Sequence, residues 1–182
     1  MVHILRLEIR GFKSFRDRTV LEFSEGLNAI TGKNGSGKSN IVDAIRFALG
    51  SNSPKALRES RMSRLISEGS RIRMARVSIT LSNEDGALPV SSDKVTITRE
   101  LLEDGTQRYY LNGRRTTRSA VEDFLAAAGI SADGLNIVPQ GSLNAVAEMS
   151  PNERMELIQE IIGIRVYDEK KEEALQRLRS AD

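Results

Sequence analysis

The sequence contains no cysteine, and His3 is its only histidine. Disulfides and thiolate metal sites are therefore excluded, and catalysis centred on histidine is not expected. No apolar run approaches the roughly 20 residues that a membrane-spanning helix needs, and the first residues do not form the apolar core of a secretory signal. We therefore expect a cytoplasmic protein that is neither secreted nor inserted in a membrane.

Neither sign of charge dominates the chain, whose net charge is only +2. Apolar residues make up 39% of the sequence and charged residues 29%, which is the balance of a soluble globular domain. Basic residues are nevertheless concentrated between Lys55 and Arg76, where Glu59 and Glu68 are the only acids. Such a stretch indicates either a nearby polyanion, such as nucleotide or nucleic acid, or an ordinary solvated face, and the sequence leaves both open.

Apolar periodicity and turn residues divide the chain into strands and helices. Strands are predicted at residues 3–10, 19–23, 27–31, 75–81, 94–102, 107–111 and 137–138. Helices are predicted at residues 38–49, 65–66 as a single turn, 119–128 and 150–162. Ser119 and Glu122 have the spacing of a capping box, and Asp104-Gly105 and Asn112-Gly113 predict tight turns of an antiparallel meander.

From residue 164 the sequence repeats in steps of three and four residues, as in a coiled coil. The repeat consists of Ile164, Tyr167, Lys171, Ala174, Leu178 and Ala181. An ordinary amphipathic helix fits the same short run, because Lys171 is a poor seam residue.

Residues 32–39 match the phosphate-loop pattern G-x-x-x-x-G-K-[ST] at every fixed position, with a predicted strand before and a helix after. Glycines let the backbone turn its N–H groups toward an anion, and the helix adds the positive end of its dipole. Lys38 would reach the β- and γ-phosphates, and the Ser39 hydroxyl would ligate Mg²⁺. The sequence therefore predicts ATP and Mg²⁺ as cofactors. The expected nucleotide-binding residues here are Gly32, Lys33, Asn34, Gly35, Ser36, Gly37, Lys38, Ser39 and Asn40.

A phosphate loop alone does not hydrolyse ATP, because a second Mg²⁺ carboxylate is also needed. No run of four apolar residues ends in Asp-Glu, and no Leu-Ser-Gly-Gly segment occurs. We therefore expect the chain alone to bind ATP with little turnover.

Several other segments closely resemble the start of SMC (structural maintenance of chromosomes) proteins. They are Gly11-Phe12-Lys13-Ser14-Phe15, Leu57-Arg58-Glu59-Ser60, Asn112-Gly113 and residues 26–30, 40–45, 136–141, 149–154 and 161–164. The resemblance implies an α/β P-loop NTPase lobe of the ABC-ATPase head type, with a mixed sheet around the loop helix, an antiparallel β meander and a final coiled-coil helix. It places the N-terminal head lobe at residues 1–163 and the start of the coiled-coil arm at 164–182.

The resemblance also assigns residues outside the loop. Gln140 would contact Mg²⁺ and the attacking water, and Arg58 would reach the phosphates from a loop of its own. Lys13 and Ser14 would lie close to the bound phosphates. The catalytic residues expected on this basis are Lys38, Gln140 and Arg58, and the expected Mg²⁺ ligands are Ser39 and Gln140.

In SMC proteins ATP engages two heads and hydrolysis releases them, which powers chromosome condensation, segregation and cohesion on DNA. The resemblance thus implies four partners: a C-terminal head lobe with the missing catalytic motifs, a second head, a kleisin subunit, and DNA bound without sequence preference. It implies a location on the nucleoid. The arginines that we consider for DNA contact are Arg61, Arg64, Arg71, Arg73, Arg76, Arg114, Arg115 and Arg118.

Two other classes share the phosphate loop. A DNA-repair ATPase of the RecF/RecN-like group is the main alternative, although the segments at residues 57–58 and 137–141 favour SMC. A transporter nucleotide-binding domain or a P-loop kinase fits less well, because the chain shows neither a signature segment nor an acceptor site with a lid.

Overall fold

The computed structural model describes residues 2–70, 72–132, 137, 150 and 155. The chain divides into two compact units, residues 1–133 and 134–182, and the elements described below belong to the first. Several expectations lie outside the described residues, namely Gln140, Val138 of the last strand, most of the helix at 150–162, the boundary at 163 and the coiled-coil helix. No helix in the described part of the chain is long and apolar enough to cross a membrane.

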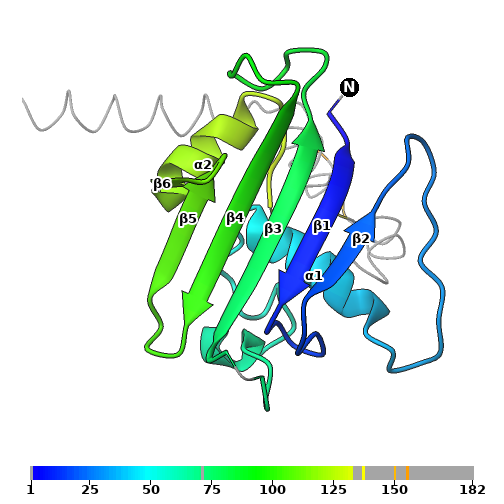
Figure 1. The fold of residues 1–182 in the computed structure, drawn as a ribbon, viewed down its shortest axis with the longest axis vertical. Coiled ribbons are helices and arrows are strands. Elements are labelled where there is room, and N and C mark those ends of the chain that lie inside the picture. Colours follow the sequence, from blue (N-terminus) through cyan, green and yellow to red (C-terminus); the bar gives the residue numbers. More distant parts are fainter. Residues whose placement is uncertain (1, 71, 133–136, 138–149, 151–154, 156–182) are drawn as a thin grey trace, which may run out of the picture. The chain divides into compact units, whose positions relative to one another are not determined.

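One antiparallel sheet, in the order β2-β1-β3-β4-β5-β6, forms the body of the first unit (Figure 1). Its strands are β1 (Ile4–Arg10), β2 (Thr19–Glu22), β3 (Met74–Ser82), β4 (Lys94–Leu102), β5 (Gln107–Leu111) and β6 (Arg114–Thr116). The sheet confirms the predicted meander and the α/β class. The edge strand β6 was not predicted. It follows a turn in which Asn112 (φ +48) and Gly113 (φ +77) both adopt the left-handed backbone of a type I′ hairpin.

Helix α1 (Lys38–Ala48) lies across one face of this sheet (Figure 1). Alternate strand residues on that face are apolar and fully or almost fully buried: Leu7, Ile9, Val77, Ile79, Val95, Ile97 and Leu101. The ring of Phe47 on α1 packs against that of Phe12, with the ring centres 5.2 Å apart. Removal of this apolar surface from water is the main force that holds α1 on the sheet.

The opposite face of the sheet is polar. Hydroxyl pairs join β3 to β4, with Ser78 Oγ 2.8 Å from Thr98 Oγ1 and Thr80 Oγ1 3.1 Å from Thr96 Oγ1. Alternation of apolar and polar residues is typical of antiparallel strands, and Thr98 and Glu100 on the polar face are each only 6% exposed.

Arg99 on β4 reaches from the packed face to the C-terminal end of α1 and is fully buried. Its Nη1 donates to the carbonyl oxygens of Phe47, at 2.8 Å, and Ser51, at 2.7 Å. Its guanidinium also lies 4.2 Å from the centre of the Phe47 ring. A cation is favourable at the carbonyl end of a helix, so Arg99 fixes that end of α1 on the sheet.

The strand predicted at residues 27–31 is wrong, because this segment is a loop that pairs with no described strand. Leu27 is 99% exposed and Ile30 is 45% exposed. A strand needs a neighbour for its N–H and C=O groups, and the described sheet ends at β2. For the same reason the expected mixed sheet is antiparallel throughout in the residues that the structure describes.

Helix α2 (Arg118–Ala126) confirms the helix predicted at residues 119–128, but its cap differs from the prediction. Thr117 is the N-cap, and its Oγ1 accepts a hydrogen bond from the Ala120 N–H at 3.2 Å. The chain leaves β6 extended, which gives Thr117 the backbone that a cap requires. The capping box predicted at Ser119 and Glu122 is therefore wrong, since Ser119 lies inside the helix and Glu122 pairs with Arg118 at 2.7 Å.

Replacing Thr117 by alanine should lower the free energy of unfolding by about 1 kcal/mol, because the Ala120 N–H loses its acceptor. Ser119→Ala is the matched control and should change it by less than about 0.5 kcal/mol. Urea denaturation followed by circular dichroism measures both. Equal losses in the two variants would contradict the assignment of the cap.

Candidate functional site

The phosphate loop, residues 32–39, leads directly into α1. Gly35 (φ +78) and Gly37 (φ +92) have the left-handed backbone that side chains disfavour, and Gly37 is the cap at which α1 begins. The first turn of α1 contains no acidic residue, so no carboxylate on the helix itself neutralises its positive end. The predicted arrangement of a tight glycine loop before a helix N-terminus is therefore present.

Close packing also requires glycine in the loop. A Cβ atom at position 37 would lie 2.6 Å from Ser14 Oγ, and one at position 32 would lie 2.8 Å from Ser36 Oγ. Neither distance leaves room for a methyl group without movement. Ser14 thus lies against the phosphate loop, and its predicted place beside bound phosphates stays a prediction.

Lys38 folds back over the loop. Its Nζ donates to the carbonyl oxygens of Gly32 and Lys33, each at 2.7 Å. Backbone groups therefore hold this ammonium at the loop, beside the start of α1. An ammonium, a helix N-terminus and glycine turns together form a cradle for phosphate, so these residues fit the phosphates of ATP.

A metal ion at this site would need further ligands besides the side chains that the structure describes. No group of three or more acidic or histidine side chains that could hold a metal occurs within the described residues. Ser39, at the start of α1, is the predicted Mg²⁺ ligand that the structure describes. Mg²⁺ at this position is normally shared with the nucleotide phosphates, which is consistent with so few protein ligands.

Lys13 lies on the turn after β1 and has a left-handed backbone (φ +47). Its side chain is only 7% exposed, and its Nζ forms an ion pair with Asp43 Oδ2 at 2.6 Å. The same Nζ donates to the Leu57 carbonyl at 2.5 Å and lies 3.3 Å from Glu59 Oε1. Lys13 therefore joins the turn after β1 to α1 and to the loop that contains Arg58.

Arg58 approaches the same carboxylate from the loop between α1 and the 3₁₀ turn η1 (Met62–Leu65). Its Nη2 lies 2.6 Å from Asp43 Oδ2, and its Nε donates to Asp43 Oδ1 at 3.1 Å. Nη2 also donates to Asn40 Oδ1 at 3.2 Å. The hydrogen bond to Asp43 raises the pKa of Arg58 above its ordinary value, so this side chain stays positively charged.

Asp43 is the residue of this cluster that sequence reasoning missed. It lies on α1 and its side chain is 4% exposed, on the buried side of the helix with Ala44 and Phe47. The available signal was a single carboxylate within the apolar stripe of an amphipathic helix. A buried charge needs a charged partner, and Asp43 has two, the buried Lys13 and the half-exposed Arg58.

The predicted residues Lys13, Ser14 and Asn40 line a pocket of about 550 Å³ together with Arg16 and Glu59, and none of residues 32–39 lines it. Asn40 Nδ2 donates to Ser14 Oγ at 2.9 Å, which ties the first turn of α1 to the segment after β1. The structure thus brings Lys13, Ser14, Asn40 and Arg58 together at the start of α1. The roles of these residues, and that of Gln140, stay predictions.

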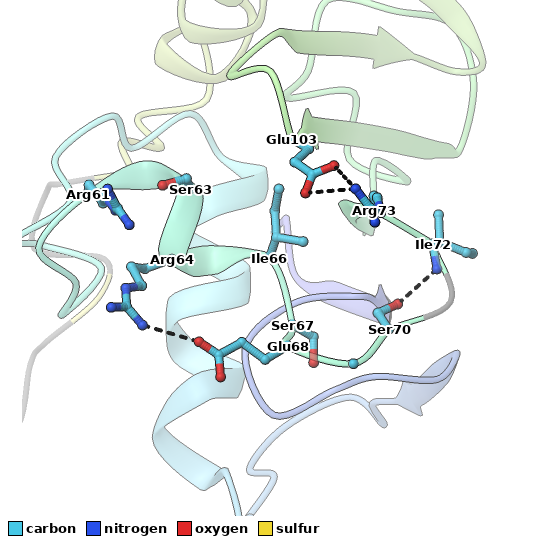
Figure 2. Close-up of a pocket in the computed structure, with 11 residues that line it drawn as sticks. Arg61, Ser63, Arg64, Ile66, Ser67, Glu68, Ser70, Ile72, Arg73 and Glu103 are labelled. Atoms are coloured by element: carbon cyan, nitrogen blue, oxygen red, sulfur yellow. Dashed lines mark hydrogen bonds and ion pairs between the residues drawn. The ribbon is translucent and has the colours of Figure 1, made fainter.

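A second pocket, of about 640 Å³, lies between η1 and the start of β3, and Arg61, Arg64 and Arg73 line it (Figure 2). Figure 2 shows ion pairs in its wall: Arg64 with Glu68 at 3.2 Å and Arg73 with Glu103 at 3.1 Å. The remaining arginines considered for DNA lie elsewhere. Arg76 is on the polar sheet face, Arg114 and Arg115 are on β6, Arg118 is on α2, and Arg71 lies outside the described residues.

Comparison with known proteins agrees with this geometry. The family model described as RecF/RecN/SMC N terminal domain matches residues 3–150. The chromosome partition protein Smc of Pyrococcus furiosus is 50% identical over 187 residues, covering 100% of this chain and 16% of that protein.

Two solved structures are similar over most of the chain. One comes from work on the ATP-driven dimerization and DNA-stimulated activation of SMC ATPases, with a TM-score of 0.80, 49% identity and coverage of 87% of this chain and 99% of that one. The other is the Pyrococcus furiosus Smc head domain with an extended coiled coil, bound to the C-terminal domain of ScpA. It has a TM-score of 0.83 and 50% identity, with coverage of 100% of this chain and 47% of that one.

A RecF structure aligns less well, with 24% identity and a TM-score of 0.52, and this likeness concerns the fold alone. This chain spans only 16% of the length of the Smc protein that it matches at 50% identity. On the family match and the head structures together, the chain belongs to the SMC family and has the fold of the N-terminal part of an SMC head.

Proposed function

We propose that this chain binds ATP with Mg²⁺ as the N-terminal lobe of an SMC ATPase head. The observation that carries the proposal is Lys38, whose ammonium lies over a glycine loop at the start of α1. In the complete protein, ATP-driven head engagement and hydrolysis would power chromosome condensation and segregation on the nucleoid. The 50% identity to a protein named for chromosome partition supports this setting over DNA repair.

Each residue of the site has a definite role in this proposal. Lys38 and the loop amides bind the β- and γ-phosphates, and Ser39 ligates Mg²⁺. Arg58 supplies further positive charge beside the first turn of α1, where it contacts Asn40. Gln140 contacts Mg²⁺ and the attacking water, an assignment that rests on the family resemblance.

The chain alone holds half of the hydrolytic groups, so turnover requires a C-terminal head lobe. The loop at residues 27–31 supports this partner, because Leu27 and Ile30 expose apolar surface directly before the phosphate loop. Pairing of this segment with a strand of the second lobe would bury both side chains and fix the phosphate loop at the same time.

Two further protein partners follow from similar structures. A second head would share the nucleotide, as the ATP-driven dimerization described for the similar SMC ATPase suggests. A kleisin would bind the completed head, since ScpA binds the Pyrococcus furiosus head.

DNA is the proposed substrate on which the head acts. Among the described residues, Arg61, Arg114 and Arg115 are exposed and form no ion pair, whereas Arg64, Arg73, Arg76 and Arg118 each pair with a glutamate. Arg114 and Arg115 adjoin each other on the edge strand β6. Unpaired arginines at an edge are the best-placed contacts for the phosphate backbone.

Replacing Lys38 by alanine should weaken ATP binding by about 10- to 100-fold, because a charge-assisted contact with phosphate is lost. Turnover should appear only when wild-type chain is mixed with a C-terminal head lobe, and it should vanish with the Lys38 variant. Titration calorimetry and phosphate release measure the two effects, with the exposed Lys94→Ala as control. Rapid turnover by the chain alone would contradict the proposal of a split head.

Replacing Leu27 by glutamate should weaken assembly with the C-terminal lobe by at least about tenfold, because a buried leucine contributes about 1.5–3 kcal/mol. Ala126→Glu places the same charge at another exposed position and should leave assembly unchanged. Analytical ultracentrifugation of the mixed lobes reports the affinity. Wild-type assembly by the Leu27 variant would remove this segment from the interface.

The double variant Arg114→Gln/Arg115→Gln should bind DNA more weakly, with the slope of log affinity against log salt reduced by about two. Arg64→Gln/Arg73→Gln removes equal charge from arginines that already pair with glutamates, and its effect should be smaller. Fluorescence anisotropy across a salt series measures both. An unchanged affinity and slope in both variants would exclude these arginines as DNA contacts.

A further inference from the structure

One buried carboxylate, that of Asp43, holds two cations that come from separate loops. Lys13 Nζ and Arg58 Nη2 each lie 2.6 Å from the same oxygen, Asp43 Oδ2. The side chains of Asp43 and Lys13 are 4% and 7% exposed, whereas that of Arg58 is 50% exposed. Asp43 is therefore an internal anchor, and Arg58 is the member of the cluster that solvent and ligands can reach.

Asp43 is the acid that pairs with both cations, Lys13 and Arg58. Both nitrogens lie against one oxygen atom, so their charges repel each other at short range. Glu59 is the other acid of the cluster, and it lies 3.3 Å from Lys13. Among the residues that the structure describes, Asp43 is the one acid with which Arg58 forms an ion pair. The carboxylate of Asp43 is therefore the charged partner that keeps Arg58 next to α1, where Arg58 also donates a hydrogen bond to Asn40.

Backbone strain indicates that this arrangement is more than a chance surface contact. Only Lys13, Arg58 and Asn112 among the described non-glycine residues have a positive φ. Asn112 serves a hairpin turn, whereas Lys13 (φ +47) and Arg58 (φ +56) both direct their side chains to Asp43. Such conformations cost free energy and persist where surrounding contacts fix them, as happens at functional sites.

A chain of contacts connects this anchor to the phosphate loop. Arg58 Nη2 donates to Asn40 Oδ1, and Asn40 Nδ2 donates to Ser14 Oγ. Ser14 Oγ in turn lies 2.6 Å from where a Cβ atom of residue 37 would be, in close contact with the loop. The position of Arg58 is thus tied to the residue directly after the phosphate loop and to the turn of the loop itself.

We infer that Asp43 is the positioning residue of the nucleotide site: it holds Lys13 and Arg58 beside the start of α1, and ATP affinity depends on it although Asp43 does not contact the phosphates. This inference rests on the proposed ATP-binding function. The change in ATP affinity that it predicts for loss of the Asp43 charge is opposite in sign to the purely electrostatic expectation. Removing a negative charge close to bound phosphate would by electrostatics alone strengthen ATP binding, whereas loss of a positioning residue weakens it.

The test compares Asp43→Asn with Glu100→Gln, in the full chain alone and assembled with a C-terminal head lobe. Glu100 is a matched control, because it is a buried carboxylate paired with Arg76 on the opposite face of the sheet. Asp43→Asn should weaken Mg²⁺-ATP binding about tenfold, while Glu100→Gln leaves it unchanged. An affinity that is unchanged or higher in Asp43→Asn would overturn the inference.

ATP binding by the wild type and by Lys38→Ala shows whether a negative result concerns Asp43 or the proposed ATP-binding function. If wild type and Lys38→Ala bind ATP equally weakly, the ATP site itself is wrong and the inference fails with it. If wild type binds and Lys38→Ala does not, the behaviour of Asp43→Asn decides the inference alone.

A second measurement covers the case in which Asp43→Asn does not fold. Lys13→Met and Arg58→Gln each leave Asp43 with one cation, so both single variants keep the buried charge paired. Because the two side chains share one carboxylate, their effects on ATP affinity should be non-additive by at least about threefold in a double-mutant cycle. Additive effects would show that Lys13 and Arg58 act independently and would overturn the inference.

Discussion

The contact between α1 and the packed face of the sheet determines where the phosphate loop can lie, because the last two loop residues, Lys38 and Ser39, are the first two of that helix. Apolar burial holds α1 on the sheet, but such burial is not directional. Two charged contacts supply the direction. Arg99 fixes the carbonyl end of α1, and Asp43 joins the helix to the loops that carry Lys13 and Arg58. The position of the phosphate-binding residues thus depends on how α1 packs in the core.

Much of this fold could be predicted from the sequence, because local patterns determine it. Alternating apolar residues located β1, β3 and β4, and the fixed positions of the phosphate loop located the start of α1. The strand at residues 27–31 could not be judged in this way, since pairing depends on a neighbour that a local pattern does not show. Thr117 was overlooked as a cap because Ser119 and Glu122 offered a more familiar spacing.

In the candidate site, too, local patterns predicted some residues, whereas others depend on contacts that are distant in sequence. Glycine, lysine and serine in the loop could be named from spacing alone, because their chemistry requires that spacing. Resemblance to SMC proteins was needed to select Lys13 and Arg58, which lie far from the loop in sequence. Asp43 was overlooked because its importance comes from two residues 30 and 15 positions away, and only the folded chain brings them to it.

The exposed loop at residues 27–31 affects how readily the protein is cleaved by proteases and associates with other chains. Exposed apolar residues such as Leu27 in an unpaired loop are sites of proteolysis and of unwanted association between chains. In the proposed head, pairing with a C-terminal lobe would bury Leu27 and Ile30 and so protect the chain from both.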